Sequence, residues 1–366
     1  MRLFRCRNCG QTVFFENSIC GNCGHALGYL ARAQEMLTLT TQGDGYQRLR
    51  SRQRYRYCDN AEHQACNWLI PANSADRFCP ACRFNQLIPD LSVAENLVQW
   101  QRMEAAKHRL FYTLIALGLP LHSYAEDPEH GLAFEFLPDP PGPGPRILTG
   151  HDEGLITINL AEADDAMREK FRTEMGEPYR TLLGHFRHET GHYFWNILLR
   201  DKGQLDGFRS IFGDETADYA EALQAHYQNG APADWGQHYI SAYAAAHPWE
   251  DFAESWAHYL HIVDTLETAS AFGLRIHPSA GTHKLLRAEI NFDPHKATAI
   301  DQLIASWLPL TVAVNSLNRS MGMTDLYPFT LAPQVIEKLG FIHTLVHNHH
   351  QPSKNKSFFE NSGELT

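Results

Sequence analysis

The chain has 366 residues, of which 43% are hydrophobic and 20% charged, and its formal net charge is −11 at pH 7. These values are ordinary for a soluble protein of two or three domains. The longest apolar stretch, LIASWLPLTVAV from Leu303, contains a proline and is too short to span a membrane. The N-terminal MRLFRCRNCG has no apolar core of signal-peptide length, so we expect a cytoplasmic protein with no membrane partner.

Cysteine and charge divide the chain into two parts. All eight cysteines lie between Cys6 and Cys82, a clustering that in a reducing compartment indicates metal ligands rather than disulfides. Residues 1–90 have a net charge of +4, and the remainder has −15. The sequence therefore predicts a small cysteine-rich module in residues 1–90, followed by a larger acidic part.

The first cysteine cluster has the pattern C-x2-C, ten residues, C-x2-C, formed by Cys6, Cys9, Cys20 and Cys23. Each pair makes a tight turn that directs two thiolates to one ion, so the pattern predicts a structural zinc site. A haem attachment site would need histidine where Gly24 stands.

The second cluster has a longer first gap and comprises Cys58, Cys66, Cys79 and Cys82. His63 could replace one of these thiolates. Four cysteines already complete a zinc site and leave no thiol over, which favours a second structural zinc held only by thiolates.

Arginines alternate in RLRSRQRYRYC, residues 48–58. One interpretation is a strand that binds nucleic acid through charge and ring stacking, and the other is a solvated strand of a zinc ribbon. Two zinc ions with four thiolates each add about −2 apiece and cancel the charge of the module. This balance, with the lack of any second basic stripe in the sequence, favours the solvated strand.

After the module, residues 91–118 have the apolar spacing of a long amphipathic helix, with a capping box of Ser92 and Glu95 and a stop at Gly118. Short strands are expected at 132–137, 146–149 and 155–160, with a hairpin turn at 150–154. We expect the strand at 155–160 to form the edge of a small sheet, where an extended peptide could pair. The polar end, 351–366, is expected to be disordered.

A helix is predicted from Tyr179 to Arg200, with Pro178 in its first turn. Its core stripe and its polar stripe lie on opposite faces. The polar stripe contains H-E-x-x-H, in which His188 and His192 lie one turn apart and can reach one ion. Glu189 lies about 100° further round, where it could contact a water molecule beside the ion without ligating it.

A third ligand must come from elsewhere in the chain. A second helix is predicted after Pro248, and its polar face carries Glu250, Glu254, His258 and His261. The alternative for this face is an exposed row of charges. A third histidine at metzincin spacing is absent after His192, and a second E-x-x-H, which a di-iron bundle needs, is absent from the chain.

Over nearly its whole length the sequence resembles the putative zinc-binding metallopeptidase family of bacteria, in which zinc ribbons precede an H-E-x-x-H domain. The resemblance rests on YRTLLGHFRHETGHYFW, GLITINLAEADD, DYAEALQAHY, EDFAESWAHY, SLNRSMG and the residues around Cys66 and Cys82. The segment EDFAE also looks like the E-x-x-A-E helix of certain gluzincins. That likeness implies Glu250 as the third zinc ligand and Tyr243, seven residues earlier, as a catalytic tyrosine.

The expected fold is therefore α+β: a double zinc ribbon in residues 1–90, a connecting helix in 91–118, and a mostly helical zincin-like domain with a small sheet in 119–350. The expected activity is zinc-dependent peptide hydrolysis with Glu189 as general base, and Glu254 would orient a ligand histidine. We expect one catalytic and two structural zinc ions, a peptide or protein substrate, and ribbons that bind a protein partner rather than nucleic acid. The alternative is a zinc-ribbon adaptor or nucleic-acid-binding protein with a non-catalytic metal site.

Overall fold

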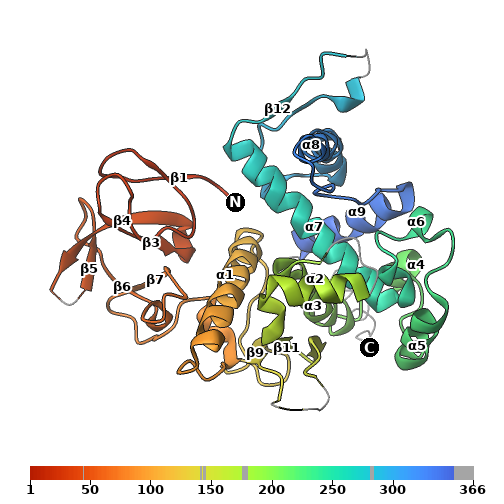
Figure 1. Cartoon of the computed structure of the whole chain (residues 1–366), viewed down its shortest axis with the longest axis horizontal. Coiled ribbons are helices and arrows are strands. Elements are labelled where there is room, and N and C mark those ends of the chain that lie inside the picture. Colours follow the sequence, from red (N-terminus) through yellow and green to blue (C-terminus); the bar gives the residue numbers. More distant parts are fainter. Residues whose placement is uncertain (44, 141, 143–145, 175–179, 281–283, 350–366) are drawn as a thin grey trace, which may run out of the picture.

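The computed structural model describes residues 1–43, 45–140, 142, 146–174, 180–280 and 284–349 (Figure 1). The predicted disordered tail, 351–366, lies outside these residues. Within them, no helix combines the length and the apolar character needed to cross a membrane.

The N-terminal module is built from two small antiparallel sheets. A hairpin of β1 (Phe4–Arg5) and β2 (Thr12–Val13) precedes a five-stranded sheet in the order β3-β4-β5-β6-β7. The bounds of these five strands are Ala26–Leu30, Glu35–Gln42, Gly45–Arg48, Arg54–Tyr57 and Leu69–Pro71. The cysteines stand in the turns around the strands, as tight metal-binding turns require.

The arginine-rich segment 48–58 is not one strand. Arg48 ends β5, a turn follows, and Arg54 begins β6, which pairs antiparallel with β5. The alternating arginines are therefore divided between two strands and their connection, and they do not form one continuous basic strand.

Helix α1 (Ala94–Ala116) connects the module to the rest of the chain and lies near the centre of the molecule (Figure 1). It ends before Gly118, whose φ is +67°, as glycine allows. The predicted capping box is wrong, because the N-cap position falls on Val93, which has no side-chain cap. The Ser92 hydroxyl instead donates to Asp90.

A four-stranded mixed sheet lies below α1 in the order β10-β11-β9-β8. Its strands are β8 (Asn85–Leu87), β9 (Ala133–Leu137), β10 (Gly150–Asp152) and β11 (Leu155–Asn159). The hairpin between β10 and β11 turns at Glu153 and Gly154, both with positive φ.

Two strand predictions are wrong. Residues 146–149 form no strand, since the backbone enters the sheet only at Gly150. The strand of residues 155–159 is internal rather than an edge, because β10 covers it on one side and β9 on the other. The exposed edge next to the helices is therefore β10.

Helices make up most of the remaining chain. The predicted H-E-x-x-H helix begins at Leu182 rather than at 179, and residues 178 and 179 lie outside the described part. It runs as α3 (Leu182–Trp195) and ends in a π-helical turn, Asn196–Arg200. The other helices are α2 (Asp165–Glu174), α4 (Leu205–Phe212), α5 (Tyr219–Asn229), α6 (Trp235–His238), α7 (Pro248–Ala271), α8 (Ile300–Ser320) and α9 (Pro333–Asn348), and a two-stranded ribbon joins β12 (Arg275–Ile276) to β13 (Ala288–Glu289).

The two parts of the chain share one hydrophobic core. Buried Phe15, Tyr29 and Trp68 of the ribbon module belong to the same apolar cluster as Tyr112 of α1 and Trp256 of α7. Tyr112 contacts Phe15 with ring centroids 5.3 Å apart. The observed architecture is thus α+β, with a cysteine-rich ribbon region packed onto a helical domain through α1.

Candidate metal centre

Helix α3 presents two histidines on one face. Its first turn is capped by Thr181, whose hydroxyl accepts a hydrogen bond from the Gly184 amide. His188 and His192 follow one turn apart, with their Nε2 atoms separated by 3.2 Å. Both imidazoles therefore project to the same point.

Gly191 lets α3 and α7 approach closely. A Cβ atom at this position would lie 2.8 Å from the Ala253 Cα and 3.2 Å from the Trp256 Cβ. A larger residue would force the two helices apart, so glycine is needed at this contact. The approach places the histidines opposite the first turns of α7.

The first turn of α7 supplies a carboxylate. The His247 side chain caps the helix by accepting from the Trp249 amide, and Pro248 takes the first helical position. Glu250 is almost fully buried, and its Oε2 lies 3.0 Å from His188 Nε2 and 3.5 Å from His192 Nε2. Two helices thus bring three potential ligand atoms together.

Glu254, one turn further along α7, contacts the other side of His188. Its Oε1 lies 2.7 Å from His188 Nδ1, and its Oε2 accepts from the Ser241 hydroxyl at 2.6 Å. Burial opposes ionisation of Glu254, but the hydrogen bond and charge of His188 outweigh burial and lower its pKa to about 2. Since an ionised carboxylate only accepts hydrogen bonds, His188 Nδ1 donates to Glu254, and Nε2 is the ring nitrogen that faces Glu250.

This arrangement attracts a cation. Glu250 Oε2 is buried and has no hydrogen-bond donor among the described residues. Burial opposes protonation of His188, yet Glu250 and Glu254 raise the pKa of His188 well above its usual value. Nitrogen and carboxylate ligands at 2.0–2.2 Å from a tetrahedral zinc ion would be roughly 3.3 Å apart, so the observed spacing of 3.0 to 3.5 Å fits zinc.

Two further side chains predicted for the site lie beside these donors. Glu189 is buried, and burial raises its pKa despite the neighbouring His188 and His192. Tyr243, in a short turn before α7, has its ring centroid 6.0 Å from that of His188.

Aromatic packing fixes the orientation of His192. The Trp249 ring lies on it with centroids 3.8 Å apart, and the ring of His151, from the edge strand β10, lies 6.0 Å away. The edge of the small sheet therefore adjoins the three donors.

The polar face of α7 is buried or half-buried and divides into two groups. Glu250 and Glu254 face α3 at the donor cluster, whereas His258 bonds to the Tyr327 hydroxyl at 2.7 Å. His261 contacts the Arg187 guanidinium. His258 and His261 thus have partners away from the donor cluster. The alternative of an exposed row of charges on this face is wrong.

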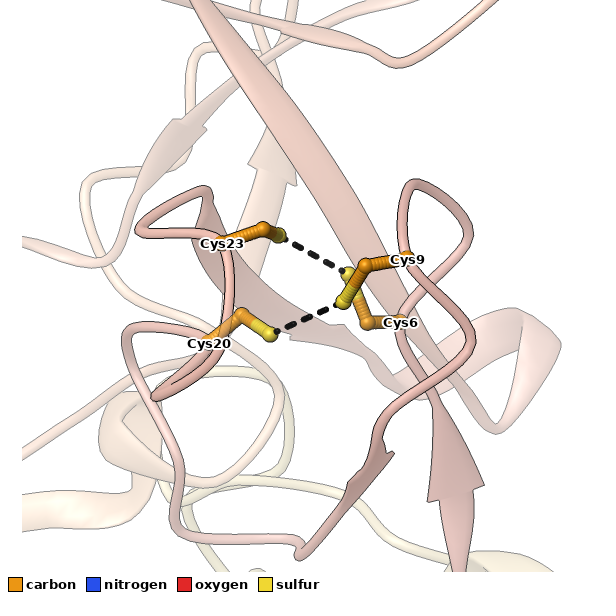
Figure 2. Close-up of side chains that lie close together, drawn as sticks. All are labelled: Cys6, Cys9, Cys20 and Cys23. Carbon is orange, nitrogen blue, oxygen red and sulfur yellow. Dashed lines mark hydrogen bonds between the residues drawn. The ribbon is translucent and has the colours of Figure 1, made fainter.

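The cysteines gather as two separate groups of four. In the first, Cys6 Sγ lies 3.6 Å from Cys23 Sγ, and Cys9 Sγ lies 3.6 Å from Cys20 Sγ. Figure 2 shows the four thiols pointing toward one another. Zinc–sulfur bonds of 2.3 Å in a tetrahedron place sulfur atoms roughly 3.8 Å apart, so the spacing fits zinc. All eight thiols are free of disulfide bonds.

The second group, Cys58, Cys66, Cys79 and Cys82, has a histidine at its side. It is His108 of α1 rather than His63, with Nε2 at 3.5 Å from Cys82 Sγ and 3.8 Å from Cys79 Sγ. His108 Nδ1 lies 2.6 Å from the Glu104 carbonyl oxygen. The helix that joins the two parts of the chain thereby contacts the ribbon's second cluster directly.

Comparison with known proteins accounts for both parts of the chain. A family model described as "Putative zinc-binding metallo-peptidase" matches residues 96–345, and a zinc-ribbon domain model matches residues 3–93. The chain belongs to this metallopeptidase family. The suspected family and the order of ribbon and helical domain are thus confirmed.

Relatives of this family member occur in mycobacteria. The uncharacterized proteins Rv2568c of Mycobacterium tuberculosis H37Rv and Mb2598c of Mycobacterium bovis are each 42% identical to it over 349 residues. The matches cover 94% of this chain and 95% of each relative. No solved structure matches the chain.

Two residues that the sequence did not single out lie beside the candidate metal sites. The Tyr219 hydroxyl donates a hydrogen bond of 2.5 Å to Glu250 Oε1, and His108 lies beside Cys82. Tyr219 stands 31 residues before Glu250 on a helix that buries none of its residues, so no apolar period marks it. His108 lies on the buried face of α1, where the sequence pattern predicts a core residue rather than a neighbour of the cysteines.

Proposed function

We propose that the protein is a zinc-dependent peptidase of the gluzincin type, whose catalytic ion is held by His188, His192 and Glu250. The observation that carries the proposal is the convergence of two imidazole nitrogens and one buried carboxylate oxygen within 3.5 Å of one another. Three protein donors form this group within the described part of the chain. Three protein ligands and one open position characterise catalytic rather than structural zinc.

Zinc in this site would supply a water of pKa ~7 and would polarise a peptide carbonyl. The neighbouring Glu189 is the candidate general base. It would accept the proton of the attacking water and pass it to the leaving amine. Its place in the helix, between the two histidines and next to His188, suits this transfer without making it a ligand.

Two more side chains would assist. The Tyr243 hydroxyl would donate a hydrogen bond to the carbonyl oxygen as that oxygen gains negative charge. Glu254 would hold His188 in the orientation that directs Nε2 to the ion, through the 2.7 Å contact at Nδ1.

The substrate would be an extended peptide. The strand β10 ends its sheet, so its outer edge has backbone groups available for pairing. The proximity of His151 on this strand to His192 would bring a paired peptide next to the catalytic ion.

The two cysteine clusters would each bind one structural zinc ion, giving one catalytic and two structural ions per chain. The ribbons would contact a protein partner rather than nucleic acid, a choice supported by the division of the arginine segment between two strands. Eight free thiols fit a cytoplasmic location.

The alternative class is an adaptor in which the same donors hold a non-catalytic ion. A fourth protein ligand in the zinc-loaded protein would support the adaptor, and a water molecule in that position would support the enzyme. Glu189 has no role in a purely structural site.

The test is a cleavage screen. Peptides cut in a bacterial proteome by the wild-type protein should remain intact with Glu189→Gln, which keeps the three ligands and removes the base. Glu129→Gln, at an exposed position, serves as the matched control and should cut like the wild type. Equal cleavage by Glu189→Gln and wild type, with equal zinc content, would refute the mechanism.

A further inference from the structure

The two oxygens of the Glu250 carboxylate have different partners. Oε2 faces His188 and His192, whereas Oε1 accepts a hydrogen bond of 2.5 Å from the Tyr219 hydroxyl. Tyr219 comes from α5, so the third donor of the metal centre is held by a helix that supplies no ligand itself.

Carboxylates can bind a metal through one oxygen or through both. A bidentate Glu250 would need Oε1 to turn towards the ion, and this would break its bond to Tyr219. A single-oxygen ligand keeps coordination low and reserves the remaining position for water or substrate. The phenol thus favours the arrangement that catalysis requires.

We propose that Tyr219 is a positioning residue that keeps Glu250 a single-oxygen ligand of the catalytic ion. The inference rests on the proposed function, since it presupposes a metal at His188, His192 and Glu250. Tyr219 acts through Glu250 and is not itself a catalytic residue.

Neighbouring residues hold Tyr219 in position, although α5 buries none of its residues. The Asp218 side chain caps the helix by accepting from the Glu221 amide. The Tyr219 ring packs against His247 and Trp249, with ring centroids 5.3 and 5.6 Å away. The first turn of α5 therefore docks on the first turn of α7.

Helix α5 also reaches the candidate catalytic tyrosine. The ring of His226, about two turns after Tyr219, lies 6.1 Å from the ring of Tyr243. The helix that holds Glu250 therefore adjoins Tyr243 as well.

The test compares Tyr219→Phe with the wild type in the absence of substrate. Zinc affinity is measured by competition with a chelator, and the catalytic ion alone is replaced by cobalt while the ribbons keep zinc. We expect the variant to bind zinc at this site 10- to 100-fold more weakly, as loss of such a partner typically does. We expect weaker visible absorption from cobalt, because a second Glu250 oxygen raises its coordination number.

Tyr124→Phe removes the same oxygen from an exposed tyrosine and should change neither measurement. Unchanged affinity and an unchanged cobalt spectrum in Tyr219→Phe would overturn the proposal. Weaker binding with an unchanged spectrum would overturn it too, since the phenol would then only help α5 to dock. Neither readout needs turnover, so a failure of the peptidase proposal would be seen separately, in the cleavage screen.

Discussion

Single side chains at the candidate metal centre are held by specific partners. Glu254 holds one side of His188, Trp249 lies on His192, and Tyr219 binds the free oxygen of Glu250. Such contacts fix ring and carboxylate orientation before any ion binds, which reduces the rearrangement that binding requires.

Tyr243→Phe tests the proposed oxyanion donor. The variant loses one oxygen, so fold and zinc content should be retained. If Tyr243 stabilises the oxyanion, turnover of a substrate found in the cleavage screen should fall by roughly 10²–10³, about 2.7–4 kcal/mol in the barrier. Near-normal turnover with full zinc would remove Tyr243 from the mechanism and leave Glu189 and the ion without this donor.

His258 should make the protein sensitive to acid. Burial, with the charge of Arg187, outweighs the attraction of Glu254 and lowers the pKa of His258 to about 4. In the unfolded chain its pKa is about 6.5, so below pH 6.5 the unfolded state takes up a proton that the folded state does not. Proton uptake by the unfolded state therefore lowers the free energy of unfolding as the pH falls from about 6.5 to about 4.

The measurement is urea unfolding of the wild type and His258→Asn at pH 7 and pH 5, with zinc content checked at both. Between these values the wild type should lose about 2 kcal/mol more than the variant, since each pH unit contributes at most about 1.4 kcal/mol. Parallel losses in the two proteins would show that His258 titrates normally.

At the scale of elements, the contact between α3 and α7 creates the donor cluster, because each helix carries only part of it. At Gly191 the two backbones are close, since a Cβ atom there would lie 2.8 Å from the Ala253 Cα. The π-helical turn after Trp195 and the cap at Thr181 set the two ends of α3. The separation of the helices, rather than either helix alone, determines the spacing of the donors.

Gly191→Ala should disturb this contact. The added methyl group would meet the Ala253 backbone, so we expect a loss of about 1–3 kcal/mol in the free energy of unfolding and weaker zinc binding at the catalytic site. Gly207→Ala in α4, where the nearest atom is 3.6 Å away, is the control. It should be neutral or stabilising by up to about 1 kcal/mol, as alanine favours helix. Equal stability and zinc affinity in both variants would contradict this account.

At the scale of the whole molecule, α1 joins the ribbons to the helical domain. It contacts the second cysteine cluster through His108, and its Tyr112 donates to Glu267 of α7. The ribbons and the helical domain are therefore packed as one body around a shared core, although separate family models describe them.

Metal analysis of the reduced, folded protein should find three zinc ions per chain. A chelator should remove the ion at His188, His192 and Glu250 first, because three protein ligands hold it and four thiolates hold each of the others. His188→Gln should contain two ions and lose neither under the same treatment. Two or fewer tightly bound ions in the wild type would contradict the count.

The sequence by itself determined the features that depend on neighbours along the chain. The spacing of Cys6, Cys9, Cys20 and Cys23 predicts one cluster, and the helical period predicts that His188 and His192 share a face. It also predicted the α+β class and the order of ribbon and helical domain. These follow from local backbone geometry, which a short segment specifies without the rest of the fold.

The tertiary structure decided what depends on partners distant in sequence. It placed β10 rather than β11 at the sheet edge, brought Tyr219 to Glu250, and set His108 beside Cys82. The N-terminal cap of α1 also differs from the prediction, because the Ser92 hydroxyl bonds to Asp90 instead of to the helix. Strand order and such contacts follow from how complete helices and sheets pack, and no spacing within one segment encodes that packing.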